Sequence, residues 1–236
     1  MLDQLKVKIF ADGADLDGIL ELYGKPYVKG FTTNPTLMRK SGISDYEKFS
    51  RQALEIVSDR PISFEVFSDE FDEMERQARK IAAWGKNVYV KIPVTNTRRE
   101  SSAELVCRLA AEGVQLNVTA LLTLGQVSEV SKALGSFTSS YISVFAGRIA
   151  DTGCDPVPLM KEAVEIMSRY QNQELIWASP RELLNIYHAN EVGCHIITVT
   201  HDILKKLVLI GKDLDEYSLD TVKMFYNDAQ KAGYQI

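Results

Sequence analysis

The 236-residue sequence lacks the features that mark several classes of protein. No apolar run approaches the roughly 18 residues that span a membrane, and the N-terminal stretch MLDQLKVKIFADG lacks the basic-then-apolar order of a secretory signal. Lys and Arg number 27 against 32 Asp and Glu, so the formal net charge is -5 and no basic excess indicates nucleic-acid binding. We therefore expect a cytoplasmic protein whose partners are neither membranes nor nucleic acids.

Cysteine is scarce and scattered. Cys107, Cys154 and Cys194 form no CxxC pair, which suits a reducing compartment and does not match a cysteine-based zinc site. We expect all three to be small buried residues rather than ligands or disulfide partners. The three histidines show neither HxH nor HExxH spacing, so we expect no metal and no metal cofactor.

What the sequence does contain is an alternation of short β-branched or aromatic runs with amphipathic helical stretches. The strand candidates are residues 8–12, 28–34, 62–67, 88–94, 115–121, 141–145, 174–179 and 196–200. The helical patterns between them include residues 69–84, 101–111 and 155–170. Each strand and helix together occupy roughly 25–35 residues, the size of a βα unit.

About eight such units predict a closed (β/α)8 barrel, the TIM barrel fold. No low-complexity or linker-like stretch interrupts the chain, so we expect one domain over residues 1–236. Residues 214–232 predict an additional C-terminal helix that packs on a neighbouring subunit. An open doubly wound sheet is the alternative, but neither GxGxxG nor GxxxxGK[ST] follows any strand.

A lysine stands in the middle of the buried strand NVYVKIPV, residues 87–94. Side chains alternate across a strand, so its apolar residues share one face and Lys91 lies on the other. If the apolar face packs on the helices, Lys91 points into the barrel. An ammonium group there loses hydration at a cost of several kcal/mol unless it is paired or neutralised. The structural alternatives are an edge strand and an ion pair with Glu65.

The same alternation places polar side chains at the C-terminal ends of the other strands, where barrel enzymes build their catalytic face. These inward residues are Asp12, Glu65, Asn117, Thr119, Ser143 and Ser179, and Asn34 closes the second strand within FTTNP. In the seventh strand, Ile176 and Ala178 are assigned to the helix-facing side, opposite Ser179. One lysine among two carboxylates, two carboxamides and several hydroxyls is expected of a reaction centre.

A lysine amine attacks a ketone only when it is neutral, and desolvation inside a barrel favours the neutral form. The resulting Schiff base withdraws electrons from the adjacent carbon–carbon bond, which can then break or form without a metal. In this hypothesis Asp12 is the acid/base for the hydroxyl across that bond, and Glu65 and Thr119 relay protons through a water. Asn34 and Asn117 hold substrate hydroxyls.

Two arginines follow the later strands, after which barrels often bind phosphate. Arg148 lies in AGRI after the sixth strand, and Arg181 lies in SPRE after the seventh. We expect both to hold the phosphate end of a sugar, with Ser179 donating a hydrogen bond and the N-terminus of a helix after Ser179-Pro180 adding its dipole. Arg181 could instead pair with Glu182 or another helix carboxylate, and a sulfonate could occupy the same pocket.

Six blocks follow one another along the chain: IFADGADLDGI, GFTTNPTLM, VYVKIPVT, LNVTALLTLGQ, SVFAGRI and WASPREL. In this order they resemble the successive blocks of the transaldolase and fructose-6-phosphate aldolase family, in its small single-barrel branch. The likeness covers almost the whole chain, and TTNP and VKIP are its most specific parts.

The resemblance implies a class I, Schiff-base enzyme of carbohydrate metabolism that uses Lys91 and Asp12, needs no cofactor and acts on sugar phosphates. It also implies ring-shaped homo-oligomers, pentamers or decamers. Besides the two arginines and Ser179, the residues expected to surround the substrate are Thr33, Asn34, Glu65, Asn117, Thr119, Ser143 and Phe145.

Two positions bear on the branch of the family. Members with aldolase activity usually carry Gln in place of Glu65 and Tyr in place of Phe145, so the sequence favours a transaldolase of the pentose phosphate pathway type, which moves a dihydroxyacetone unit between sugar phosphates. The alternatives are a fructose-6-phosphate-type aldolase, which releases that unit, and a non-catalytic barrel that binds a sugar phosphate. Residues 96–99 (NTRR) and Pro180 depart from the family pattern, which leaves a specialised sulfo- or deoxy-sugar substrate open.

Overall fold

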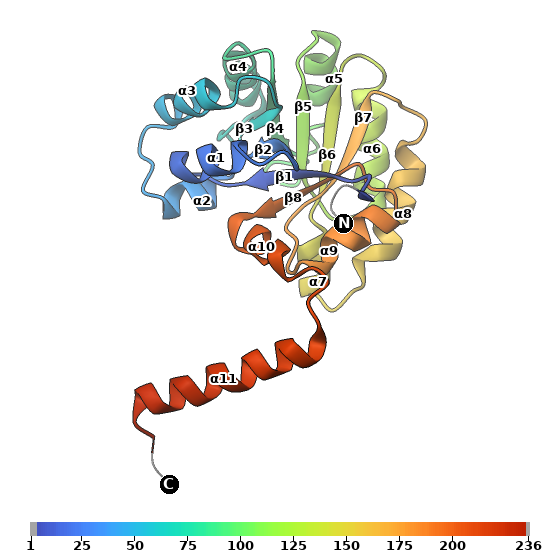
Figure 1. The fold of residues 1–236 in the computed structure, drawn as a ribbon. Coiled ribbons are helices and arrows are strands. Elements are labelled where there is room, and N and C mark those ends of the chain that lie inside the picture. The colour runs from blue at the N-terminus through green and yellow to red at the C-terminus, as the bar shows by residue number, and fades with distance from the viewer. Residues whose placement is uncertain (1–3, 235–236) are drawn as a thin grey trace.

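In the computed structural model, which describes residues 4–234, parallel strands close into a barrel wrapped by helices (Figure 1). The strands are β1 (Lys8–Asp12), β2 (Val28–Thr32), β3 (Ile62–Glu65), β4 (Val88–Pro93), β5 (Leu116–Leu121), β6 (Ser140–Val144), β7 (Gln173–Trp177) and β8 (Ile196–Thr200). Each pairs with its neighbours in chain order, and β8 pairs with β1 to close the ring. The predicted (β/α)8 barrel is confirmed. A single domain over residues 1–236 stays a prediction, and residues 1–3 and 235–236 lie outside the described residues.

The helices follow the strands along the chain. They are α1 (Leu16–Tyr23), α2 (Pro35–Lys40), α3 (Tyr46–Ile56), α4 (Phe71–Ala82), α5 (Ala103–Ala111), α6 (Leu124–Leu134), α7 (Ala146–Asp151), α8 (Pro156–Met167), α9 (Leu184–Glu191), α10 (His201–Leu204), the 3-10 helix η2 (Lys205–Leu209) and α11 (Leu214–Ala232). Several begin at side chains that accept hydrogen bonds from first-turn amides, as Asp15 does before α1 and Thr123 before α6. Within residues 4–234 no helix is both long and apolar enough to cross a bilayer, and a cytoplasmic location stays a prediction.

Apolar side chains form two separate clusters. The larger joins the outer faces of the strands to the helices. The smaller fills the lower interior of the barrel and consists of Phe10, Tyr89, Tyr141, Ile176, Ala178 and Ile196, with Phe145 packed against it. The rings of Tyr89 and Tyr141 are stacked with centroids 3.9 Å apart. Because Tyr89 precedes Lys91 by two residues on β4, this cluster forms the floor beneath the lysine.

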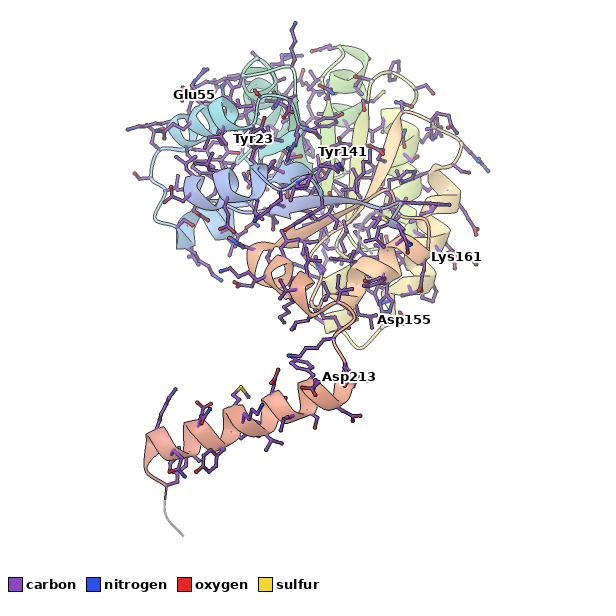
Figure 2. All side chains as sticks on the ribbon, viewed as in Figure 1. Tyr23, Glu55, Tyr141, Asp155, Lys161 and Asp213 are labelled. Carbon is purple, nitrogen blue, oxygen red and sulfur yellow. The ribbon has the colours of Figure 1, made fainter. Side chains whose placement is uncertain are left out.

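The helix α11 projects away from the barrel (Figure 1, red), and Figure 2 shows its side chains standing clear of the remaining elements. None of its side chains is buried. The predicted C-terminal helix over residues 214–232 is therefore confirmed, whereas its packing on a neighbouring subunit stays a prediction.

The expectation that all three cysteines are buried is wrong for two of them. Cys194 is buried, but Cys107 and Cys154 are exposed. Cys107 lies on the solvent side of α5, whose buried face is formed by Leu105, Val106, Leu109 and Ala110. Cys154 lies in the short connection between α7 and α8, where no strand or helix covers it.

Candidate active site

A cavity of about 430 Å³ opens at the C-terminal ends of the strands. Its wall contains all but one of the residues predicted from the sequence to form the site: Asp12, Asn34, Glu65, Lys91, Asn117, Thr119, Ser143, Phe145, Arg148, Ser179 and Arg181. Thr33 is the exception, and its side chain lies behind the wall. Strands that are far apart in the sequence therefore bring these side chains to one place.

Lys91 points into the barrel, as the alternation of its strand predicts. The residue is 9% exposed, and β4 is flanked by β3 and β5, so the alternative of an edge strand does not apply. Its Nζ donates to the backbone carbonyl of Thr33 and lies 3.8 Å from Glu65 Oε2. That separation is too long for a hydrogen bond but within the range of an ion pair, so the ion pair with Glu65 expected under the structural alternative is present.

Glu65 is enclosed at the end of β3, with 5% of its surface exposed. Its Oε2 accepts a hydrogen bond from Thr33 Oγ1 at 3.0 Å, while Oε1 is buried without a partner among the described residues. Burial raises the pKa of Glu65, opposed in part by Lys91 and Thr33. This carboxyl group therefore holds a proton to higher pH than usual, and its Oε1 has an unused hydrogen-bonding position.

Asp12 is held through both carboxylate oxygens. Oδ1 accepts from Thr32 Oγ1 at 2.8 Å and Oδ2 accepts from Asn34 Nδ2 at 3.0 Å. The orientation of the Asn34 amide is fixed because its Oδ1 accepts from Leu37 N and caps α2. Burial raises the pKa of Asp12, while Lys91, Thr32 and Asn34 act in the opposite direction.

A second hydrogen-bonded chain runs across β3, β5 and β6. Asn117 Nδ2 donates to Ser63 Oγ at 3.1 Å, and Ser143 Oγ donates to Asn117 Oδ1 at 2.7 Å. Both contacts are buried, so the amide plane of Asn117 is fixed. One N–H of Asn117 has no further role in this chain and is available to a substrate hydroxyl.

The assignment of faces on β7 is wrong. Ile176 and Ala178 belong to the interior cluster, and Trp177 belongs to the outer one. Ser179 still reaches the cavity because it follows the strand with φ 58°, a left-handed conformation that turns the chain. The alternation was ambiguous because the segment LIWA is apolar on both faces, as expected of a strand buried on both sides.

The two arginines both line the cavity but have different interaction partners. Arg181 forms a two-pronged ion pair with Asp151 of α7, not with Glu182, and its Nε lies 2.8 Å from Asp151 Oδ1. This pairing lowers the pKa of Asp151 and raises that of Arg181. Arg148 is exposed, and its guanidinium lies 5.3 Å from the centre of the Phe145 ring. Within residues 4–234 it has no carboxylate partner.

The helix expected directly after Ser179-Pro180 begins later in the chain. Its first residue is Leu184, and the backbone N–H of Arg181 donates to the side chain of Asn185. Because a helix dipole acts mainly within its first turn, the predicted contribution of this N-terminus beside Ser179 is wrong.

Sequence reasoning missed four threonines that line the cavity: Thr32 on β2, Thr36 in α2, and Thr198 and Thr200 on β8. The Oγ1 atoms of Thr32 and Thr198 lie 2.5 Å apart. On β8 the sequence does carry a signal for this, because Thr198 and Thr200 alternate with the outward Ile197 and Val199.

Comparison with known proteins identifies the family to which the chain belongs. The family model for transaldolase/fructose-6-phosphate aldolase matches residues 9–236. The chain belongs to the transaldolase/fructose-6-phosphate aldolase family. It is 33% identical over 231 residues to a "Probable transaldolase" of Thermoanaerobacter sp. (strain X514), covering 98% of this chain and 100% of that relative. It is 37% identical over 202 residues to "Probable transaldolase 2" of Listeria monocytogenes, covering 85% and 88% of the two chains.

Solved structures share the fold at low sequence identity. Tryptophan synthase subunit alpha from Campylobacter jejuni superimposes with a TM-score of 0.55 at 12% identity, covering 84% of this chain and 87% of that one. The likeness shows the barrel architecture alone. The assignment to the transaldolase/fructose-6-phosphate aldolase family therefore rests on sequence.

The two most specific blocks of this family member meet in space. VKIP forms the end of β4, and TTNP runs from the end of β2 into α2. Their contact is the hydrogen bond from Lys91 Nζ to the Thr33 carbonyl. Within residues 4–234 no three His, Cys, Asp or Glu side chains gather closely enough to hold a metal. The acid/base groups at the strand ends of the cavity are therefore one enclosed amine, one enclosed carboxyl group (Glu65) and one half-buried carboxyl group (Asp12).

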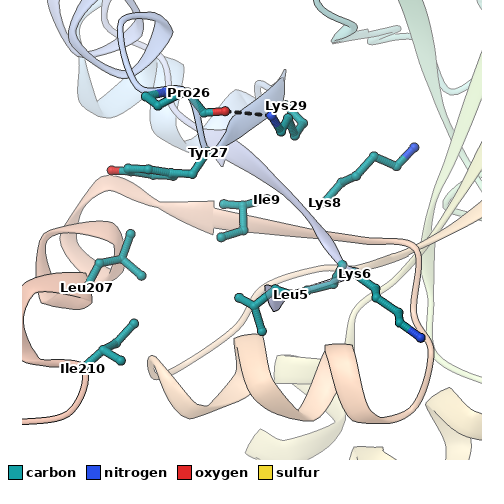
Figure 3. A pocket seen from close by; sticks show the side chains of 10 residues that line it. Leu5, Lys6, Lys8, Ile9, Pro26, Tyr27, Lys29, Leu207 and Ile210 are labelled. Carbon is teal, nitrogen blue, oxygen red and sulfur yellow. Dashed lines mark hydrogen bonds between the residues drawn. The ribbon is translucent and has the colours of Figure 1, made fainter. Parts of the chain in front are cut away.

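A larger cavity of about 750 Å³ lies outside the barrel wall, at the start of β1 and β2 beside η2 (Figure 3). Its lining combines apolar side chains such as Leu5, Leu207 and Ile210 with the lysines of positions 6, 8 and 29. Lys29 Nζ donates to the carbonyl of Pro26. This groove has no acid/base group beside a buried amine, so it is not a second reaction centre.

Proposed function

We propose that this protein is a transaldolase-type transferase, which moves a dihydroxyacetone unit between sugar phosphates through a Schiff base on Lys91. The observation that carries the proposal is an almost fully enclosed lysine amine that shares its cavity with a buried carboxyl group, Glu65, and a half-buried one, Asp12, both with raised pKa values. Membership of the transaldolase/fructose-6-phosphate aldolase family supports this class of chemistry.

The first step joins the enzyme to the donor ketose. The neutral amine of Lys91 attacks the ketone carbon, and the carbinolamine that forms loses its hydroxyl as water to give an iminium ion. The departing hydroxyl needs a proton, which Glu65 supplies directly or through a water held by Thr119. The raised pKa of Glu65 suits this role because the group keeps its proton at higher pH.

The second step breaks the carbon–carbon bond. The carboxylate of Asp12 takes the proton of the hydroxyl beyond that bond, the bond's electron pair moves to the iminium, and an aldehyde leaves. The remaining enamine attacks an acceptor aldehyde while Asp12 returns the proton. Water then releases the new ketose from Lys91.

Glu65 and Phe145 favour transfer over release. Phe145 carries no hydroxyl, so this side chain cannot donate a hydrogen bond that directs water to the enamine, and its ring lies against the guanidinium of Arg148. The bound dihydroxyacetone unit then waits for an acceptor aldehyde. The alternative is a fructose-6-phosphate-type aldolase, which would release the dihydroxyacetone unit without an acceptor aldehyde.

The test is borohydride trapping with fructose 6-phosphate, followed by peptide mass spectrometry. We expect a reduced adduct on Lys91, no adduct in Lys91→Met, and an unchanged adduct in the control Lys86→Met, which alters an exposed lysine. An adduct on another lysine, or none in the wild-type protein, contradicts the proposal. Release of glyceraldehyde 3-phosphate is then compared with and without an acceptor aldehyde. Equal rates would identify an aldolase.

We also propose that α11 packs on a second copy of this chain. After β8 the barrel has only the short α10 and η2 where a full helix is expected, and the groove of Figure 3 lies beside η2. The charges are complementary, because α11 carries four acidic side chains and two lysines, while the groove carries three lysines, of which Lys8 already pairs with Glu174. Such contacts, repeated head to tail, generate the expected ring.

A further inference from the structure

We infer that Thr198 on β8 is a positioning residue for the acid/base Asp12 and that it acts through Thr32. The inference rests on the proposed function, which gives Asp12 its role. Thr198 does not touch Asp12. It contributes by fixing the orientation of the Thr32 hydroxyl group.

The hydrogen bonds have a defined direction. Thr32 Oγ1 donates to Asp12 Oδ1 at 2.8 Å and lies 2.5 Å from Thr198 Oγ1. A hydroxyl has a single proton to donate. Since Thr32 gives its proton to Asp12, Thr198 must donate to Thr32. The chain therefore runs from Thr198 through Thr32 to the carboxylate.

Barrel closure brings these residues together. β1 lies between β2 and β8, so Asp12 pairs in register with Thr32 on one side, and Phe10 pairs with Thr198 on the other. The contact between Thr32 and Thr198 consequently crosses the inner face of β1 immediately below Asp12. Thr32 is 3% exposed and Thr198 is 7% exposed, so bulk water does not readily replace either partner.

The arrangement matters because the two oxygens of Asp12 are held differently. Asn34 is fixed as a donor to Oδ2 by its cap on α2, whereas the hydroxyl of Thr32 is free to rotate unless a partner holds it. Thr198 is that partner. Without its hydroxyl, Thr32 can turn away and Oδ1 loses a donor that supports the ionised form against burial.

The test compares Thr198→Val, which removes the hydroxyl at nearly constant shape, with Thr198→Ser, which retains it. The titration of Asp12 is followed by infrared spectroscopy of full-length protein labelled with carboxyl-13C aspartate, and Asp12→Asn identifies the band. The pH profile of kcat/KM for ketose cleavage is measured alongside. We expect Thr198→Val to move both the Asp12 midpoint and the acid limb upward by about one pH unit. Its kcat falls roughly tenfold or more with little change in KM, and Thr198→Ser stays close to wild type.

A double variant tests whether Thr198 acts through Thr32. We expect Thr32→Val/Thr198→Val to shift the Asp12 midpoint no further than Thr32→Val alone, because the chain is already broken. Additive shifts, an unchanged midpoint in Thr198→Val, or a serine variant that behaves like the valine variant would each overturn the inference. If Thr198→Val does not fold, Thr198→Ala, which also lacks the hydroxyl, is compared with Thr198→Ser instead.

Two different measurements distinguish a failure of the proposed function from a failure of the inference about Thr198. The infrared titration needs no turnover, so it decides the role of Thr198 even if the wild-type protein traps no ketose. Trapping on Lys91 in Thr198→Val, together with an unshifted Asp12 midpoint, would leave the Schiff-base proposal intact and reject the inference alone.

Discussion

At the scale of single residues, the two arginines of the cavity have the same charge but different availability. Arg181 already forms a two-pronged ion pair with the carboxylate of Asp151. A substrate anion must therefore compete with that carboxylate for the guanidinium. Arg148 contacts the face of Phe145 and can turn toward an anion at the cost of a weaker interaction. We therefore expect the binding of a substrate anion to depend mainly on Arg148.

We predict that Arg148→Gln raises KM for a phosphorylated ketose by roughly 10- to 100-fold, because a charge-assisted hydrogen bond contributes about 1.5–3 kcal/mol. Arg181→Gln should raise KM by less than about fivefold, since its charge is largely neutralised by Asp151. Steady-state kinetics with phosphorylated and unphosphorylated ketoses measures both effects. A larger loss in Arg181→Gln than in Arg148→Gln would show that the substrate displaces Asp151.

The sequence allowed the orientation of many site residues to be predicted, where one face of a strand was clearly apolar. Lys91, Glu65 and Asn117 alternate with buried aliphatic side chains, so their inward direction followed from the pleat. The direction of Ile176 could not be predicted in this way, because both faces of β7 are apolar. The carbonyl of Thr33 beside the Lys91 amine was also beyond prediction, since a backbone contact between β2 and β4 leaves no trace in residue identity.

At the scale of elements, the junction of α7 with the end of β7 shapes the anion end of the cavity. A Cβ added at Gly147 would lie 1.5 Å from the carbonyl oxygen of Ser179, and Gly147 N donates to the carbonyl of Ala178. The left-handed turn at Ser179 and the first turn of α7 are thus in direct backbone contact. Glycine is required here by close approach rather than by its own dihedral angles.

We predict that Gly147→Ala destabilises the protein by about 3 kcal/mol, because the backbone of Ser179 or α7 must move to admit the methyl group. The matched control is Gly125→Ala in the first turn of α6, where the nearest atom to the added Cβ is at 3.9 Å. That change should be neutral or stabilise by about 0.5–1 kcal/mol. Urea unfolding of both variants provides the comparison, and equal midpoints would contradict the close contact.

Strand and helix positions were predictable to within a few residues, but the connections after the strands were not. β1 and β8 have the predicted bounds, whereas β2 ends at Thr32 because Asn34 leaves the ladder to cap α2. The delayed start of α9 has a similar cause. The side chain of Asn185 accepts hydrogen bonds from the backbone of Arg181 and Glu182, which satisfies amides that an earlier helix would have used.

At the scale of the whole molecule, the barrel separates stability from chemistry along its axis. Phe10, Tyr89, Tyr141 and Ile196 fill the lower interior, and the ionisable groups lie above them at the C-terminal ends of the strands. Burying Glu65 and Lys91, and partly burying Asp12, costs stability that this apolar floor and the outer cluster must offset. The floor also closes the cavity from below, so in the proposed reaction the ketose and both aldehydes would pass through the open end.

The remaining question at this scale is what covers α11 and the groove beside η2. Phe225 is 64% exposed and lies near the centre of the broad apolar face of α11, whereas Asn227 lies on its polar face. We predict that Phe225→Glu lowers the mass of the assembly in sedimentation equilibrium, because a charge in that contact would be desolvated. Asn227→Glu, with the same change in charge, should leave the mass unaltered.

Leu207→Asp alters the groove itself and should lower the mass of the assembly in the same way, because it removes an apolar side chain from the surface on which α11 of the second copy would pack. Circular dichroism checks that all three variants stay folded. A wild-type protein that sediments as a monomer, or a Phe225→Glu variant with full mass, would contradict the docking of α11 on a second copy.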